Sequence, residues 1–396
     1  MHTVERFALS AGAKINKPYI YDKFFPVTVD KYITFEAGKQ NESKTYDHWP
    51  EVIELISPTL ERLDIKIIQV GSGEDLSLDG CVNLNGSPSH GQAAYIIKKG
   101  LFHFGVDSFY SQVASHYDKK VLSLISTTLT QHSKPYWSED DNYSCISPDF
   151  PDGRKPAYSN NEFPKSVNLI KPENVARQIL DLLGEKLDFN YESQFIGSQY
   201  GSVYIDIIPN TTPLEYNSSF GTARIRMDLE YDEKILLDNL NLAQNAIIIT
   251  NQPFSLKMIN DFKSKISNII FIFDEETANE KDFIEGLISM GIKTNFVTYE
   301  GKDKADELKL RYMEHILVQN QKHLSKETIE DSIDDINKLY FKSSKRVLSK
   351  GKIYSSYYHY KNDIPSESFD RTIEPVKDDP DFWRDLNHFN LLKSLD

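Results

Sequence analysis

The residues with the clearest potential for chemistry follow a predicted strand at 101–105 and open a predicted helix at 108–117. The backbone N–H groups in the first turn of a helix lack helical partners, and together with the helix dipole they attract phosphate groups. At this helix start Ser108 can add a hydroxyl donor, and Asp107 can cap the helix or bind a ligand hydroxyl. Taken alone, both residues are explained at least as well by capping as by a phosphate site.

Three further loops of the same half follow predicted strands: Glu36–Lys44, Gly71–Asp75 and Gly86–His90. In an open parallel sheet, ligands bind beside the carboxyl ends of the strands, at the point where the strand order reverses. These loops are therefore the other places where ligand contacts are expected.

The elements that position these loops alternate between strand and helix. Short apolar or β-prone runs predict strands at 31–35, 65–70, 82–84, 101–105 and 120–125. Helices are predicted from apolar spacings of three and four residues, or from Pro and Gly at their ends, at 48–63, 89–99, 108–117 and 172–184. Such alternation predicts a parallel sheet with helices on both faces. The polar stretch 126–165 is expected to be a long connection.

The second half repeats this alternation. Strands are predicted at 202–208, 246–250, 268–273 and 294–298, and helices at 236–242, 255–265, 280–290 and 305–317. A long helix is expected at about 325–349, followed by a polar, aromatic tail laid across the body. The predicted fold is α/β with two Rossmann-like domains, 1–185 and 186–324, and a C-terminal helix and extended tail over 325–396.

Composition narrows the classes of function. The chain has 396 residues and a formal net charge of −14, so it is a poor general binder of nucleic acid. One cluster of basic residues has two interpretations, a solvated helix face or a local basic groove. It consists of Lys342, Lys345, Arg346, Lys350 and Lys352.

Neither a disulfide scaffold nor a metal site is expected. Cys81 and Cys145 are isolated and predict reduced thiols, and His90, His103 and His116 lack the spacing of metal ligands. No apolar run has the length of a signal peptide or a membrane span, so the expected location is the cytoplasm, with any membrane contact peripheral.

The stretch from Lys31 to about Gly184 resembles the donor-binding half of heptosyltransferase-like glycosyltransferases of the GT-B class, similar to glycosyltransferase family 9. The matching runs are KYITFEAGKQNESKTYDHWPEVIELI, IKIIQVGSGED, GLFHFGVDSFYSQVASHYDKKVLSL and PENVARQILDLLG. That stretch covers roughly two-fifths of the chain. The resemblance implies that nucleotide sugars are the donors and that no metal or other cofactor is needed.

The family carries an Asp-(Ser/Thr)-Gly-x-x-His-x-Ala signature at the donor phosphates. Here Asp107, Ser108 and Ala114 match the signature, whereas Phe109 stands in place of its glycine and Gln112 in place of its histidine. The acid and the hydroxyl are kept, and a neutral amide replaces the imidazole.

The resemblance also implies roles for the other loops. Lys39 or Lys44 would neutralise the leaving diphosphate, and Asp107, Ser108 and Gln112 would lie at the phosphates and the sugar. The nucleoside would lie near Gly71, Ser72, Gly73 and Glu74.

The order of the halves departs from the family, in which the acceptor-binding half comes first and supplies the base. Here the second α/β half follows, which indicates a GT-B pair in swapped order or a donor half with an unrelated partner domain. If the order is swapped, Asp206 and Asp228 are candidates for the base, although both could be salt-bridged surface carboxylates. Arg224 and Arg226 could clamp an anionic ligand or pair with nearby acids.

The leading hypothesis is a glycosyltransferase acting on a glycan, a lipid-linked glycan or a modified nucleobase, with the acceptor and the oligomeric state open. A second hypothesis is a catalytically inactive nucleotide- or sugar-binding protein, favoured by Phe109 and Gln112. A third is an assembly protein whose aromatic tail packs on a partner, through Tyr354–Tyr360 and Phe382-Trp383.

Overall fold

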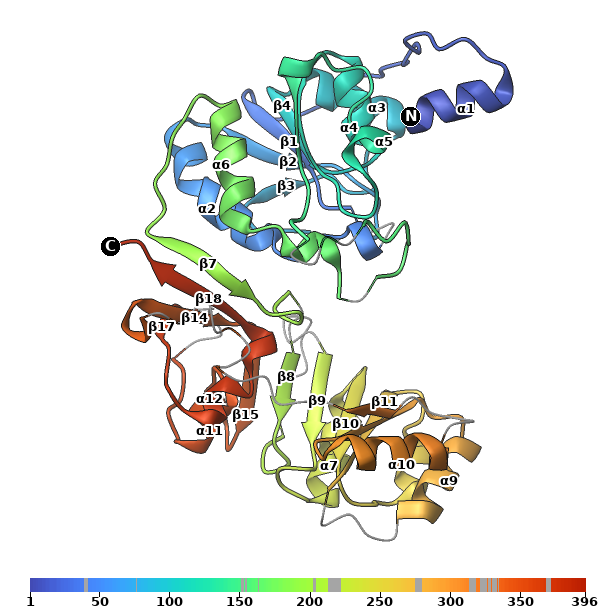
Figure 1. Ribbon diagram of the computed structural model, residues 1–396, viewed down its shortest axis with the longest axis vertical. Coiled ribbons are helices and arrows are strands. Elements are labelled where there is room, and N and C mark those ends of the chain that lie inside the picture. Colours follow the sequence, from blue (N-terminus) through green and yellow to red (C-terminus); the bar gives the residue numbers. More distant parts are fainter. Residues whose placement is uncertain are drawn as a thin grey trace. The chain divides into compact units, whose positions relative to one another are not determined.

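The chain divides into two compact units, Met1–Ser193 with Leu395–Asp396, and Gln194–Ser394 (Figure 1). The computed structural model describes residues 1–38, 42–75, 77–150, 153, 155–162, 164–201, 204–212, 222–274, 280–312, 318–320, 326, 329, 333, 335–367 and 372–396. Within these ranges, no helix combines the length and the apolar character needed to cross a lipid bilayer.

The first unit is built on a parallel sheet of six strands in the order β3-β2-β1-β4-β5-β6. Its strands are β1 (Tyr32–Glu36), β2 (Lys66–Gln69), β3 (Cys81–Asn83), β4 (Phe102–Val106), β5 (Lys120–Leu124) and β6 (Tyr143–Ile146). Its helices are α1 (Thr3–Ala11), α2 (Trp49–Arg62), α3 (His90–Lys99), α4 (Phe109–His116), α5 (Thr130–Ser133) and α6 (Pro172–Leu182), with short 3₁₀ turns at Glu42–Lys44, Asp140–Asn142 and Ser166–Leu169.

Helices cover both faces of this sheet, as the alternating pattern predicts. Figure 1 shows α2 and α6 on one face and α3 and α4 on the other. On the first face α2 and α6 bury Ile56 and Ile179 in the core that contains Phe35 and Phe104. On the other face, α3 and α4 bury Ile97 and Val113 beside Tyr32, Ile68 and Val121. The strand β6 was missed, because it lies inside the polar stretch 126–165.

The second unit contains a sheet of eight strands in the order β13-β12-β11-β10-β9-β8-β15-β16. Its strands are β8 (Tyr204–Ile207), β9 (Thr222–Arg226), β10 (Ala246–Thr250), β11 (Ile266–Phe273), β12 (Thr294–Thr298), β13 (Val318–Asn320), β15 (Lys345–Ser349) and β16 (Lys352–Tyr354). Neighbouring strands are parallel except β15 and β16, which form an antiparallel hairpin. The helices between its strands are α7 (Glu233–Leu242), α8 (Leu256–Asp261), α9 (Glu280–Ser289) and α10 (Lys302–Tyr312).

The C-terminal region corrects the prediction of a long helix at 325–349. Residues 339–349 form β14 (Leu339–Ser343) and β15, and burial alternates along β14 because only one of its faces meets the core. Residues 325, 327–328, 330–332 and 334 of the expected helix lie outside the described part of the chain. The alternation along β14 has the period of a strand, two residues, and not the 3.6 residues that a helix face requires.

The expected extended tail over 350–396 is also wrong, since this region is folded. It contributes β16, α11 (Tyr357–Lys361), β17 (Glu374–Pro375), α12 (Pro380–Trp383) and β18 (Phe389–Ser394). The strands β17, β14, β18 and β7 (Tyr191–Ile196) form a four-stranded sheet in that order. Phe341, Phe382 and Phe389 form its aromatic core, with ring centroids 4.7–4.9 Å apart.

Gly105 lets β1 and β4 approach closely at the carboxyl end of the first sheet. A Cβ atom at Gly105 would lie 2.5 Å from the Glu36 carbonyl oxygen, and that backbone cannot move without disturbing the ladder. We expect Gly105→Ala to lower the free energy of unfolding by about 1–3 kcal/mol through overpacking. Urea unfolding followed by circular dichroism measures this change. Gly73→Ala is the control, because its Cβ would meet only the Gly86 Cα at 3.8 Å; equal losses in both variants would contradict the packing argument.

Candidate functional site

The strand order of the first sheet reverses between β1 and β4. From β1 the chain proceeds to β2 and β3 on one side, whereas β4, β5 and β6 follow on the other. The carboxyl ends of β1 and β4 therefore flank the point where ligands of such sheets bind. Glu36 ends β1, and Asp107 and Ser108 follow β4 directly.

Three of the predicted donor-binding residues meet at this point. The Lys44 Nζ lies 2.8 Å from the Asp107 Oδ2 and 3.3 Å from the Asp107 backbone oxygen. Ser108 is the N-cap of α4, where its Oγ accepts from the N–H groups of Tyr110 (3.1 Å) and Ser111 (3.4 Å). Capping thus falls to Ser108, while Asp107 forms an ion pair with a lysine from another loop.

Glu36 is a buried carboxyl group at the centre of this arrangement, and its Oε2 accepts a hydrogen bond from the Ser108 hydroxyl. The pKa of Glu36 is raised to about 8, mainly by burial and to a lesser extent by the charges of Asp75 and Asp107. The Ser108 hydrogen bond and the Lys44 charge act in the opposite direction. At neutral pH Glu36 is therefore mostly uncharged, which limits the repulsion that an anionic ligand would meet.

The loop after β2 is folded tightly around Asp75. Its carboxylate accepts from the Ser72 N–H (2.9 Å, Oδ2) and the Ser72 hydroxyl (3.1 Å, Oδ1). A Cβ at Gly71 would lie 2.1 Å from the Asp75 Oδ2, and one at Gly86 would lie 2.7 Å from the Gly73 Cα. The glycines therefore let the loops after β2 and β3 pack against each other.

A pocket of about 300 Å³ opens at these loops and is lined by Gly71, Ser72, Gly86, Pro88, Ser89, His90 and Tyr110. Its size lies at the lower end of small-molecule sites. The ring of Phe109, 53% exposed, packs on His90 with centroids 5.3 Å apart. The residue that replaces the glycine of the family signature thus contacts a residue of the pocket wall.

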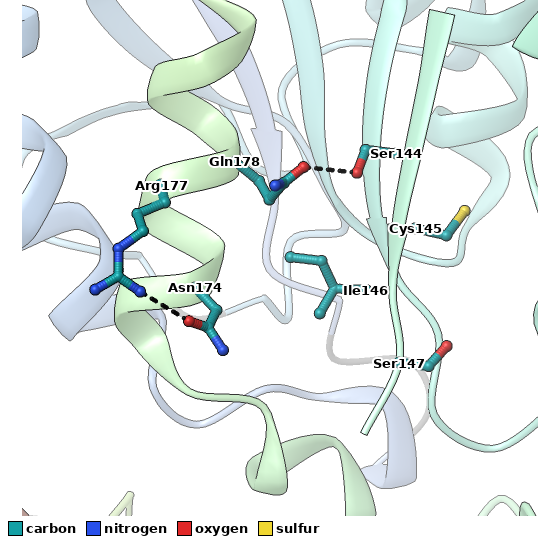
Figure 2. A pocket seen from close by; sticks show the side chains of 7 residues that line it. All are labelled: Ser144, Cys145, Ile146, Ser147, Asn174, Arg177 and Gln178. Atoms are coloured by element: carbon teal, nitrogen blue, oxygen red, sulfur yellow. Dashed lines mark hydrogen bonds between the residues drawn. The ribbon is translucent and has the colours of Figure 1, made fainter. Parts of the chain in front are cut away.

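A second pocket of the first unit, about 450 Å³, lies between the edge strand β6 and α6 (Figure 2). Several of its polar side chains are paired: Ser144 donates to Gln178 (2.9 Å), and Arg177 donates to Asn174 (3.0 Å). Burial raises the pKa of Cys145 to about 12, so the thiol is protonated. Because β6 is an edge strand away from the reversal, this pocket is the weaker candidate.

The other predicted donor contacts have varied surroundings. The Gln112 amide holds backbone of the loop after β5, with Nε2 donating to Ser133 O and Lys134 O (both 3.3 Å) and Oε1 accepting from Tyr136 N (2.9 Å). Gly73 and Glu74 are exposed and are not among the residues that line the pocket. Lys39 lies outside the described residues.

Asp206 and Asp228, the candidate bases, belong to an ion-pair network in the second unit. Asp206 lies on β8, and its carboxylate contacts Arg224 Nε (2.6 Å), Arg226 Nη1 (2.8 Å) and Lys345 Nζ (3.2 Å). Asp228 contacts Arg226 Nη2 at 2.6 Å. Both arginines therefore pair with nearby acids, one of the two alternatives the sequence left open.

The pKa of Asp206 reflects this network. Burial alone would raise the pKa, but the charges of Arg224, Lys345 and Arg226 hold it well below its ordinary value. A carboxylate in this state is a weak proton acceptor. Asp206 is also 0% exposed, so it is not the salt-bridged surface carboxylate that the sequence suggested as the alternative to a base.

Part of the chain is similar in structure to heptosyltransferases and family 9 glycosyltransferases. The E. coli ADP-heptose LPS heptosyltransferase II is 18% identical with a TM-score of 0.32, over 40% of this chain and 47% of that one. A family 9 glycosyltransferase of Veillonella parvula is 17% identical with a TM-score of 0.32, over 46% and 51%. An E. coli heptosyltransferase solved with ADP is 16% identical with a TM-score of 0.31, over 46% and 57%.

The chain thus spans about half the length of these solved structures. No family model matches the sequence, and no curated protein matches it.

Sequence reasoning missed Glu36 as a titrating group. It marked the loops that contain His90 and Tyr110 but singled out neither residue as part of a pocket wall. One feature of the sequence could have indicated that Glu36 is buried. It follows Tyr32 and Thr34 at a spacing of two residues, which places all three on the face of β1 that α3 and α4 cover. A carboxyl group at the end of a fully buried strand is rare unless it is paired or protonated.

Glu36 makes stability depend on pH. The pKa of Glu36 is higher in the folded than in the unfolded chain. Its favourable contribution to the free energy of unfolding is therefore fully present below the unfolded-state pKa and is lost as pH rises toward about 8. We expect Glu36→Gln to gain stability relative to the native chain between pH 5 and 8, by roughly 3–5 kcal/mol at most. Urea unfolding across this pH range measures the difference. Exposed Glu61→Gln is the control, and a pH-independent difference for Glu36→Gln would contradict the assignment.

The network of Asp206 predicts a structural phenotype. Asp206→Asn leaves three cations, two of them buried, short of an anion, so we expect a loss of about 3–5 kcal/mol in unfolding free energy. Asp228→Asn, which weakens contacts to one arginine, should cost less. Chemical denaturation compares the two. An Asp206→Asn protein of native stability that has lost only turnover would instead favour Asp206 as the base.

Proposed function

We propose that this chain is a glycosyltransferase that binds a nucleoside-diphosphate sugar at the reversal between β1 and β4. The observation that carries the proposal is the meeting of Lys44, Asp107 and Ser108, from two separate loops, at the start of α4. The pocket at Gly71 and Ser72 adds a place of suitable size for a nucleoside or sugar ring. The same loops carry the motifs that resemble the donor half of the glycosyltransferases.

In this proposal the bond between the sugar anomeric carbon and the donor phosphate oxygen breaks, and a bond to the acceptor oxygen forms. The acceptor proton passes to a general base, and the nucleoside diphosphate leaves with the bonding electron pair. Lys44 and the positive end of the α4 dipole offset the developing phosphate charge, so no metal ion is required. Asp228 keeps the role of candidate base, because it contacts one cation whereas Asp206 contacts three.

A second function, nucleotide-sugar binding without transfer, is favoured by one observation. Gln112 stands where the family signature has its histidine. Both the nitrogen and the oxygen of its side-chain amide form hydrogen bonds with the backbone of residues 133, 134 and 136. It is therefore not available to a phosphate as that histidine would be. Measured release of nucleoside diphosphate from the donor separates the two functions, since a binding protein shows a thermal shift without release.

The lysine supplies the sharpest test of the donor site. We expect Lys44→Met to weaken nucleoside-diphosphate binding at least tenfold, because charged hydrogen bonds contribute about 1.5–3 kcal/mol. Binding of the nucleoside without phosphates should be unchanged. Calorimetric titration of the native chain and the variant with uridine, adenosine and their diphosphates measures both.

Lys98→Met provides the matched control, since Lys98 also belongs to an ion pair of the first unit, with Asp22 at 3.1 Å. It should bind the diphosphate normally. Equal affinities of the Lys44→Met and native chains for every diphosphate would contradict the proposed position of the phosphates. Absence of binding of any nucleotide would contradict the donor site itself.

A further inference from the structure

The sheet of the second unit has its own reversal of strand order, between β8 and β15. From β8 the chain proceeds through β9, β10, β11, β12 and β13 on one side, whereas β15 lies on the other side of β8 and parallel to it. The rule applied to the first sheet therefore points to a second ligand site beside the carboxyl ends of β8 and β15.

A pocket of about 560 Å³ lies at that place. Asn210 follows β8, Glu230 follows β9, and Ser349 and Lys350 end β15. The complete lining is Asn210, Leu229, Glu230, Ser349, Lys350, Lys352, Tyr354, Tyr357, Tyr360, Lys361 and Asp363. Its volume lies in the range of small-molecule sites and suits a phosphorylated hexose.

Asn210 fixes the polar side of this pocket. Its Oδ1 accepts from the Ser349 hydroxyl (3.1 Å) and from the Lys350 N–H (3.0 Å). Its Nδ2 donates to the Glu230 Oε2 at 2.6 Å. Glu230 is thus held in place by one carboxylate oxygen, which leaves Oε1 to accept from a ligand hydroxyl.

Lys350 occupies a backbone position that a lysine rarely takes. It has φ +48°, and Gly351 has φ +73°, so these two residues form the tight turn between β15 and β16. Asn or Gly is the usual choice at such a position, and a lysine there costs backbone energy. Strain of this kind is concentrated at functional sites.

The charges of the pocket favour an anion at Lys350. Lys352 is paired with Asp363 at 3.0 Å, and Lys361 with Asp381 at 2.8 Å. Lys350 makes no ion pair with any residue that the structure describes. With Lys352 and Lys361 paired, Lys350 is the cation that the described lining offers to an anionic group.

Tyrosine rings form the apolar wall. Tyr354 and Tyr357 are mostly buried, and Tyr360 is half-buried between them, with ring centroids 5.8 and 6.1 Å away. An aromatic face of this kind packs against the C–H groups of a sugar ring.

Together these features select the class of ligand. Glu230 repels a bare anion but accepts hydroxyl groups, whereas Lys350 attracts an anion. We propose that this pocket binds a hexose-sized sugar bearing an anionic group, either a phosphate or a carboxylate. The proposal concerns the second unit alone and does not depend on donor binding by the first.

Calorimetric titration of the full chain with four probes tests the proposal. Glucose 6-phosphate or glucuronate is expected to bind at least tenfold more tightly than glucose and than inorganic phosphate, and whichever binds identifies the source of the anion. Equal affinity for glucose overturns the role of Lys350, and equal affinity for inorganic phosphate overturns the sugar. Absence of binding by every probe at millimolar concentration overturns the site.

Lys350→Asn separates binding from folding, because asparagine suits the turn and removes the charge. Its affinity for the anionic sugar should fall at least tenfold while the melting temperature is unchanged or higher. Lys257→Asn, an exposed lysine on α8, is the control and should bind normally. Unchanged affinity of Lys350→Asn overturns the proposal. The nucleotide-induced thermal shift should persist in both variants, so a failure of the donor site is distinguishable from a failure of this one.

Discussion

The central constraint in the first unit is electrostatic: the carboxyl groups of Glu36, Asp75 and Asp107 lie close together at the place where we propose that the donor phosphates bind. The protein compensates each in a different way. Burial keeps Glu36 mostly protonated at neutral pH, Lys44 pairs with Asp107, and the Ser72 N–H and hydroxyl bind Asp75. In the proposed donor site, phosphate charge would therefore not be opposed by three full negative charges.

The two units solve the problem of buried charge differently. In the first unit, a carboxyl group at a strand end remains near a pocket and shifts its pKa toward neutrality. In the second unit, Asp206 is surrounded by Arg224, Arg226 and Lys345, and its pKa moves the other way. A group of the first kind can change its protonation during function, whereas a group of the second kind mainly holds β8, β9 and β15 together.

Both sheets place pockets at the carboxyl ends of their strands, close to where the strand order reverses. In each case a loop after one strand orders the loop of its neighbour: Asp75 orders Ser72 beside Gly86, and Asn210 orders Lys350 and Glu230. The two pockets differ in lining, since the first is small and rich in glycine and serine, whereas the second carries lysines and tyrosines. The chain therefore offers two chemically distinct binding environments on one kind of scaffold.

The sequence by itself determined most of the alternating strands and helices of the first unit, though not α1, α5 or β6, and most of those between 202 and 312, because apolar periodicity reports local burial directly. It also marked the loops that meet at α4. Tertiary structure decided the partners of 339–349, since β14 pairs with β18 and β15 pairs with β8. Tertiary structure alone set the protonation of Glu36, the ion pair of Lys44 with Asp107 and the hydrogen bonds of the Gln112 amide to the backbone. Each depends on atoms brought together from distant parts of the chain.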